Sequence, residues 1–252
     1  MDWSYYLIIL IIGIFTGIAS GMFGIGGAAV STPLLNTFTL MNPLIAFATP
    51  IFTVIPTSIS GMLTYHKKKL IHKRIALYTL LTAMPVSLLG TWLTNFFHSE
   101  FLLIAKAVLL LILGLNVILS KYITKNKSSE PVDNIYANLL TGVLGGLVSG
   151  FLAVGGGIIF VNLFLRINNL EMKQAVGTSL VCVAATSVVS LIGQIILGNI
   201  DFVVGIVLTL TTVPFASIGA KMAVKMKNET LEFSFGLLII SFALFFIFNN
   251  LI

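Results

Sequence analysis

The chain has 252 residues, of which 58% are hydrophobic and only 9% are charged. A soluble domain carries roughly 25% charged residues, so this composition excludes a water-soluble fold and indicates a multi-pass protein of the lipid bilayer. The net charge of +6 comes from short basic loops between apolar segments. No basic stripe interleaved with aromatic residues is present, which argues against nucleic acid as a partner.

The apolar runs are about 17–25 residues long and lack the strict alternation of membrane β-barrels. Because every backbone polar group must find a partner inside lipid, these runs are expected to be α-helices. The sequence therefore predicts an all-α polytopic membrane protein. Taken in chain order, the predicted segments are 4–36, 43–65, 75–97, 101–120, 135–165, 172–196, 202–222 and 231–249.

The two halves of the chain repeat one another without a gap. The spacing that relates Gly17 to Gly146 also relates the other matched positions, and it is called the repeat offset below. Residues 17–27 read GIASGMFGIGG and residues 146–156 read GLVSGFLAVGG. A duplicated, glycine-interrupted apolar segment is typical of transporters that are built from two repeats. We expect one membrane transporter domain over residues 1–252, with repeat one at 4–120, a cytoplasmic linker at 121–134 and repeat two at 135–250. Further identical pairs are Gly13/Gly142, Ala46/Ala175, Thr49/Thr178, Thr57/Thr186, Pro85/Pro214 and Gly90/Gly219.

Adjacent glycines interrupt the first segment of each repeat, at residues 24–27 and 155–157. Such glycines break a helix and let its backbone approach a ligand closely. The helix that restarts after the break directs its free N–H groups and its positive dipole end toward the break, which favours an anion. A purely structural turn is the alternative. The glycines spaced by four residues, at 13, 17 and 21 and at 142, 146 and 150, are instead expected to mediate helix packing.

The charges of the loops indicate that the two repeats have opposite orientations. The loop that follows the second segment is basic in repeat one but carries only Asp201 in repeat two, and the next loop shows the reverse pattern. Placing all basic stretches in the cytoplasm accounts for 13 of the 14 Lys and Arg residues. Each repeat then reads as a glycine-broken helical hairpin plus three transmembrane helices. We expect roughly 8–10 membrane segments, in the plasma membrane of a prokaryote, with both termini outside.

Lys106 is the one basic residue that this arrangement leaves inside an apolar segment. The favoured interpretation is a lysine that snorkels to the outer interface. The alternative is a charge in a cavity that attracts an anion or takes part in coupling.

Hydroxyl groups recur at matched positions in the second segment of each repeat. They serve either as interhelical hydrogen-bond donors or as a polar lining for an oxyanion. Tyr65 and Gln194 occupy matched positions near the end of the same segment, as gate residues or as interfacial anchors, and an anchor is favoured for Tyr65. The candidate substrate-binding residues are Gly26, Gly27, Ala28, Thr49, Thr57, Gly155, Gly156, Gly157, Thr178, Ser179, Thr186 and Gln194.

The sequence lacks several motifs that would indicate other classes of protein. No Asp or Glu lies within the predicted spans except at their edges, which argues against a pump that depends on an intramembrane carboxylate. No GxxxxGK[ST] or HExxH motif and no catalytic constellation is present, so we expect neither an enzyme nor a bound cofactor. The single cysteine and the three histidines have no metal-ligand spacing, so no metal is expected.

The glycine-rich hairpins, the AVGTSL stretch at 175–180 and the SGFLAVGGG stretch at 149–157 resemble the TauE/SafE sulfite exporter family, also called the toluene-sulfonate uptake permeases. The pairs Ile71-His72 and Ile200-Asp201 add to this resemblance, which covers residues 5–250. Repeat one departs from the pattern, because Ala28 stands where repeat two has Gly157. The resemblance implies transport of small sulfur-containing anions, such as sulfite or sulfonates, or of other organic anions.

These observations together predict a secondary transporter that moves a small anion, most readily a sulfur-containing oxyanion or organosulfonate, by alternating access. Protons are the candidate coupling ion. The alternative is a membrane scaffold or sensor subunit that transports nothing. Against this alternative, the polar stretches are short loops and the linker at 121–134, which are too small for a docking domain.

Overall fold

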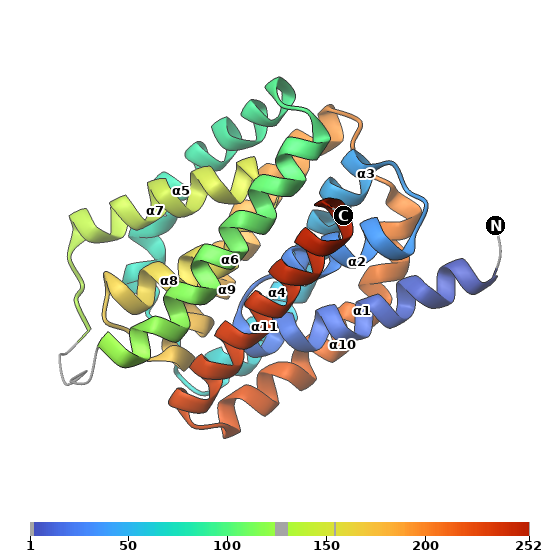
Figure 1. The fold of residues 1–252 in the computed structure, drawn as a ribbon. Coiled ribbons are helices and arrows are strands. Elements are labelled where there is room, and N and C mark those ends of the chain that lie inside the picture. The colour runs from blue at the N-terminus through green and yellow to red at the C-terminus, as the bar shows by residue number, and fades with distance from the viewer. Residues whose placement is uncertain (1–2, 124–130, 154, 252) are drawn as a thin grey trace.

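The computed structural model describes residues 3–123, 131–153 and 155–251, and these residues form a bundle of helices (Figure 1). In this part of the chain seven helical stretches are long and apolar enough to cross a membrane. The expectation of an all-α polytopic membrane protein is therefore confirmed. The elements are α1 (Trp3–Phe23), α2 (Ala28–Phe38), α3 (Pro43–Ala48), α4 (Pro50–Lys67), α5 (Lys73–Leu93), the 3₁₀ turn η1 (Thr94–Phe96), α6 (Ser99–Ile123), α7 (Ile135–Phe151), α8 (Gly157–Arg166), α9 (Met172–Ile196), α10 (Phe202–Lys225) and α11 (Asn228–Leu251).

The repeat offset also relates the positions at which helices begin in the two repeats. Helices α2 and α8 begin at the matched positions Ala28 and Gly157, and α6 and α11 begin at the matched positions Ser99 and Asn228. One difference interrupts this match: α9 is continuous, whereas its counterpart is divided into α3 and α4 at Thr49. Pro50 explains the division, because proline has no N–H group to continue a helical ladder. Much of the predicted linker at 121–134 lies outside the described residues.

Each repeat begins with a helix that ends at a glycine break and continues as a short helix. The helices after the breaks, α2 and α8, have 11 and 10 residues. At 1.5 Å per residue each is about 15 Å long, roughly half of the hydrocarbon core of a bilayer. The breaks therefore lie deep within the membrane-spanning part of the bundle rather than at its surface.

Regularly spaced glycines pack α1 against α10 and α7 against α5. A β-carbon added at Gly17 would lie 2.6 Å from the carbonyl oxygen of Thr212, and one added at Gly146 would lie 2.5 Å from that of Ala83. Both distances are shorter than van der Waals contact. The expectation that these glycines mediate close helix packing is confirmed.

The loops that carry most of the basic residues gather at one end of the bundle. Arg74 forms an ion pair with Asp133, with 3.2 Å between Nε and Oδ2. The side chain of Asn228 donates a hydrogen bond to Glu171, and the backbone N–H of Val132 donates one to the carbonyl of Asn168. These contacts join the start of α5, the residues just before α7, the loop between α8 and α9, and the start of α11.

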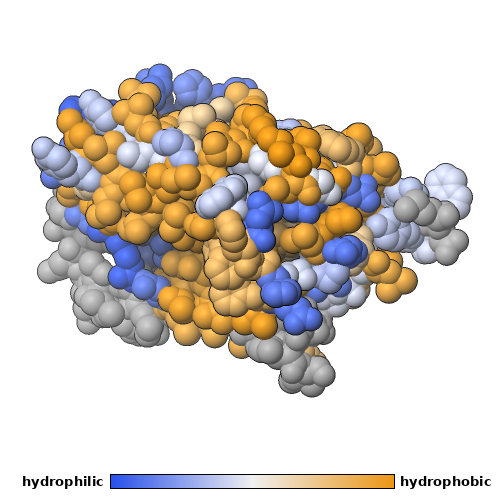
Figure 2. Space-filling model, turned by 90° about the horizontal axis from the view of Figure 1, so that it is seen from above, coloured by the Kyte–Doolittle hydropathy of each residue, from blue (hydrophilic) through white to orange (hydrophobic). Residues whose placement is uncertain are grey.

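Large hydrophobic side chains cover the flanks of the bundle. Leu81, Leu210 and Phe15 are each at least 60% exposed, from helices α5, α10 and α1. Figure 2 shows hydrophobic residues over much of one face of the molecule. A surface of this kind is suited to lipid and not to water.

Replacement of Gly146 by Val is expected to destabilise the protein, because the added side chain must displace the backbone of α5 at Ala83. Overpacking of this kind costs about 1–3 kcal/mol. The melting temperature of the purified protein in detergent should fall. The control is Leu147→Val, at a side chain that is 40% exposed on the same helix. Equal melting temperatures for both variants would contradict the packing role.

Candidate functional site

The two glycine breaks meet at the centre of the bundle. A β-carbon added at Gly26 would lie 2.7 Å from Cγ1 of Val183 and 2.8 Å from Cγ1 of Val54. One added at the matched position, Gly155, would lie 3.0 Å from Val54 and 3.3 Å from Val183. Because Val54 and Val183 are themselves matched positions, the two breaks face one another across a symmetric pair of side chains.

A helix N-terminus opens onto each break. Gly27 precedes α2 with a φ of 97°, and Gly156 precedes α8 with a φ of 75°. These left-handed conformations favour glycine and let the chain reverse direction at once. No side chain caps either helix. The N–H groups of the first turns and the positive dipole ends are thus directed toward the breaks, an arrangement that binds anions without a side-chain charge.

Buried hydroxyl groups without a hydrogen-bond partner surround the breaks. Ser58 Oγ lies 3.7 Å from the β-carbon added at Gly26, and Ser187 Oγ lies 3.1 Å from the one added at Gly155. A buried hydroxyl without a partner costs about 1–3 kcal/mol, so several together indicate a site prepared for a polar ligand. The unpartnered hydroxyls at or next to the breaks belong to Thr16, Ser20, Ser58 and Ser187, and all four side chains are fully buried. Thr57, which precedes Ser58 in α4, is also fully buried and without a partner.

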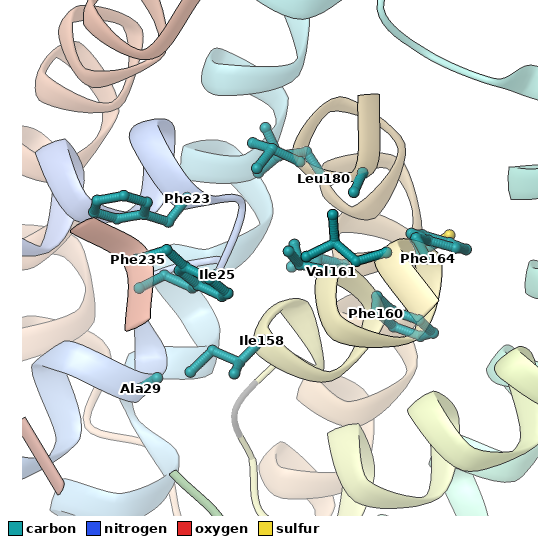
Figure 3. Packing of buried hydrophobic residues seen from close by; sticks show 14 of the residues in the cluster. Phe23, Ile25, Ala29, Ile158, Phe160, Val161, Phe164, Leu180 and Phe235 are labelled. Carbon is teal, nitrogen blue, oxygen red and sulfur yellow. The ribbon is translucent and has the colours of Figure 1, made fainter. Parts of the chain in front are cut away.

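An apolar shell encloses this polar cluster. Figure 3 shows Ile25, from the first break, and Ile158, the second residue of α8, within one buried cluster that also includes Phe23 and Phe235. The β-carbon that Gly156 lacks would lie 2.8 Å from the ring of Phe160. The breaks are therefore shielded from water, and a low-dielectric shell strengthens each hydrogen bond that a ligand would make there.

Eight of the candidate residues come together at the centre. The backbones of the two breaks are in contact, since a β-carbon added at Gly157 would lie only 2.5 Å from Cα of Ile25. The hydroxyl of Thr186 donates to the carbonyl of Cys182 at 2.9 Å and accepts from Ser149 at 3.4 Å. The candidate residues at or next to the breaks are Gly26, Gly27, Ala28, Gly155, Gly156, Gly157, Ser179 and Thr186.

Two candidate threonines make hydrogen bonds to loops instead. Thr49 Oγ1 accepts from the backbone N–H of Asp201 at 3.0 Å, and Thr178 Oγ1 accepts from that of His72 at 3.1 Å. The repeat offset relates these two pairs to one another. Each threonine therefore holds a loop of the other repeat at an end of the bundle, and the structure does not bring either one to the central cluster.

Ser179, Gln194 and Tyr65 also have structural partners. Ser179 Oγ donates to the carbonyl of Gly24 at 3.2 Å and so fixes the start of the first break. Gln194 Oε1 accepts from the amide of Asn199 at 2.9 Å, away from the cluster. Tyr65 is fully buried, and its hydroxyl contacts the carbonyl of Gly21 at 3.1 Å. The expectation that Tyr65 is an interfacial anchor is wrong.

Lys106 is buried as well, so the expectation that it snorkels to the interface is wrong. Its side chain is 0% exposed, and Nζ donates a hydrogen bond to Thr32 Oγ1 at 2.7 Å. The same Nζ lies 4.6 Å from the centroid of the Phe47 ring. The sequence identifies Lys106 as an unusual residue, because it is a lone lysine in an apolar segment. The direction of its side chain cannot be read from the sequence, because it depends on how α2 and α3 pack against α6.

Comparison with known proteins assigns the family. The model of the family described as sulfite exporter TauE/SafE matches residues 9–246. The chain belongs to the TauE/SafE family. The match spans both glycine breaks and every helix that contributes to the central cluster.

Curated relatives of this TauE/SafE chain are named as membrane transporters. The chain is 24% identical to the probable membrane transporter protein YjnA of Bacillus subtilis, with 89% of this chain and 93% of the relative covered. It is 25% identical to a probable membrane transporter protein of Methanocaldococcus jannaschii, with 89% of each chain covered. No solved structure matches the chain significantly. The protein is therefore a multi-pass membrane transporter by family, and these names specify no substrate.

Replacement of Tyr65 by Phe is expected to lower the melting temperature in detergent, because the carbonyls of Gly21 and Met22 lose a buried donor. One hydrogen bond contributes about 0.5–1.5 kcal/mol. The control is Tyr136→Phe, at a side chain that is 83% exposed. An interfacial role for Tyr65 would instead leave the two variants with the same melting temperature.

Proposed function

We propose that this protein is a secondary transporter that moves a small sulfur-containing oxyanion or organosulfonate across the plasma membrane of a prokaryote by alternating access. One observation carries the proposal: two uncapped helix N-termini meet at the centre of the bundle among buried hydroxyls that have no partner. Backbone N–H and hydroxyl groups donate hydrogen bonds, and the oxygens of an oxyanion accept them.

The charges of the surroundings support an anion over a cation. The chain segments that form the breaks, residues 24–27 and 155–157, carry no acidic residue. In the described part of the chain, the helices α2, α4, α8 and α9 contribute no Asp or Glu to the membrane interior. A cation would lack a counter-charge there, whereas an anion would interact favourably with both helix dipoles.

Inverted orientation of the two repeats is the second part of the proposal, and the contact between α4 and α9 supports it. Gly61 lies next to Leu180, and Tyr65 lies next to Gly177. As the numbering rises along α4 it falls along α9, so these matched helices cross in opposite directions. The gathering of the basic loops at one end of the bundle agrees with a cytoplasmic side there and with both termini outside.

Alternating access follows from such symmetry. If the repeats can exchange conformations, a site between them opens first to one side and then to the other. The described structure has the central cluster fully buried, as an occluded state requires. Protons remain the candidate coupling ion in this proposal.

Transport of radiolabelled sulfite into proteoliposomes tests the function and the site together. Gly155→Ala should reduce the rate at least tenfold, because its methyl group would enter the space between Val54, Val183 and Ser187. Gly198→Ala is the matched control: Gly198 has a φ of 70°, close to the 74° of Gly155, but has no atom within 4 Å of the added carbon. Equal rates for the two variants would rule out the glycine breaks as the site.

Cysteine labelling in intact cells tests the inverted orientation. In a Cys182→Ala background, cysteines at Asp201 and His98 should react with a membrane-impermeant maleimide, because these loops are predicted to be outside. Cysteines at Lys68 and Lys227 should react only after the cells are permeabilised. His98 and Lys227 are matched positions, so labelling of both from the same side would refute inversion.

A further inference from the structure

Lys106 is a basic residue in the interior of the bundle, and within the described part of the chain none of its contacts is a carboxylate. Its Nζ contacts the hydroxyl of Thr32 at 2.7 Å and the ring of Phe47 at 4.6 Å. A hydroxyl and an aromatic face offset only part of the cost of burying an ammonium group in a low-dielectric region. A lysine in this setting indicates an interaction with a charged partner that the protein itself does not supply.

The helices around Lys106 contain no acidic residue that could pair with it. Helices α2 and α3, which provide Thr32 and Phe47, carry no ionisable side chain. On its own helix, Glu100 lies in the first turn, and α8 ends at Arg166, a second cation. Gly114 of α6 packs against Ile239 and Ile240 of α11. Because α11 runs beside α6 in the opposite direction (Figure 1), the rise of the helices from this contact places Glu232 about 20 Å along the bundle from Lys106.

Lys106 also lies close to both glycine breaks. Thr32 is one helical turn after Ala28, the first residue of α2, a distance of roughly 6 Å along the helix. Ala107, the next residue after Lys106, belongs to a buried cluster with Ala153, which lies two residues before Gly155 of the second break. The ammonium group is thus within reach of an anion that binds between the breaks.

Repeat two has no counterpart of this charge. The positions matched to Lys106, Thr32 and Phe47 are Phe235, Val161 and Val176, and all three are buried apolar residues. Figure 3 shows Phe235 near Ile25 of the first break, and the ring of Phe235 lies 5.6 Å from that of Phe23. The otherwise symmetric pair of breaks therefore carries its charge on one side.

We propose that Lys106, together with the hydroxyl of Thr32, is a substrate-binding residue that pairs with the negative charge of the transported anion. This inference rests on the proposed function. It also specifies the class of substrate: a small oxyanion that carries no ammonium group of its own. A zwitterionic aminosulfonate would bring a second cation next to Lys106, and no carboxylate of the described residues lies there to balance it.

Thermal stabilisation of the purified protein by sulfite, thiosulfate and taurine tests this proposal. The wild-type protein should be stabilised by sulfite or thiosulfate and not by taurine. Lys106→Met should weaken the apparent affinity for the stabilising anion about tenfold or more, because a charge-assisted hydrogen bond is lost. Lys106→Arg should retain most of the affinity. Leu110→Met is the control, at a buried side chain one helical turn further along α6, and should bind as the wild type does.

The outcomes separate this inference from the proposed function. If the wild-type protein responds and Lys106→Met binds with unchanged affinity, the role of Lys106 is overturned and the anion site stands. Stabilisation by taurine equal to that by sulfite would overturn the substrate class alone. If no anion stabilises the wild-type protein, the proposed function fails and the role of Lys106 fails with it. Should Lys106→Met not fold, Thr32→Val replaces it, and unchanged affinity in that variant overturns the proposal.

Discussion

A helix that begins inside a membrane leaves backbone N–H groups in its first turn that water cannot reach, and this constraint governs the centre of the structure. The cost of such groups is several kcal/mol each in lipid. Here α2 and α8 both begin in the bundle interior, and the uncapped ends face one another. The glycines of the two breaks allow the reversals, and the symmetric pair Val54 and Val183 holds them together. Donors without acceptors are in this way concentrated in one small region.

The rest of the bundle serves to hold these two breaks in place. Glycine-lined contacts fasten α1 to α10 and α7 to α5, so the helix before each break packs on a helix of the other repeat. Ser179 donates a hydrogen bond to the carbonyl of Gly24 in the turn after α1, and Tyr65 donates one to the carbonyl of Gly21 in the last turn of α1. The asymmetries fall in the same region: Pro50 stands where repeat two has Ser179, and Lys106 stands where repeat two has Phe235. A transporter of two repeats can thus keep a symmetric frame and a one-sided charge.

Much of the fold follows from the sequence because its signals are local. Continuous apolar runs predict helices, adjacent glycines predict the breaks, and the repeat offset predicts even the matched starts of α2 and α8. The roles of individual polar side chains do not follow, because their partners are distant in sequence. Thr49 accepts a hydrogen bond from Asp201, which belongs to the other repeat. Lys106 is buried because α2 and α3 fold over it, and no local pattern distinguishes that outcome from snorkelling.

A structure determined with selenite, a heavier analogue of sulfite, would test the central claim most directly. Selenium scatters X-rays anomalously, so its position can be located without interpretation of weak density. A single strong peak between the first turns of α2 and α8 is the result that this account predicts. A peak at the surface of the bundle, or none at a concentration that saturates transport, would contradict it.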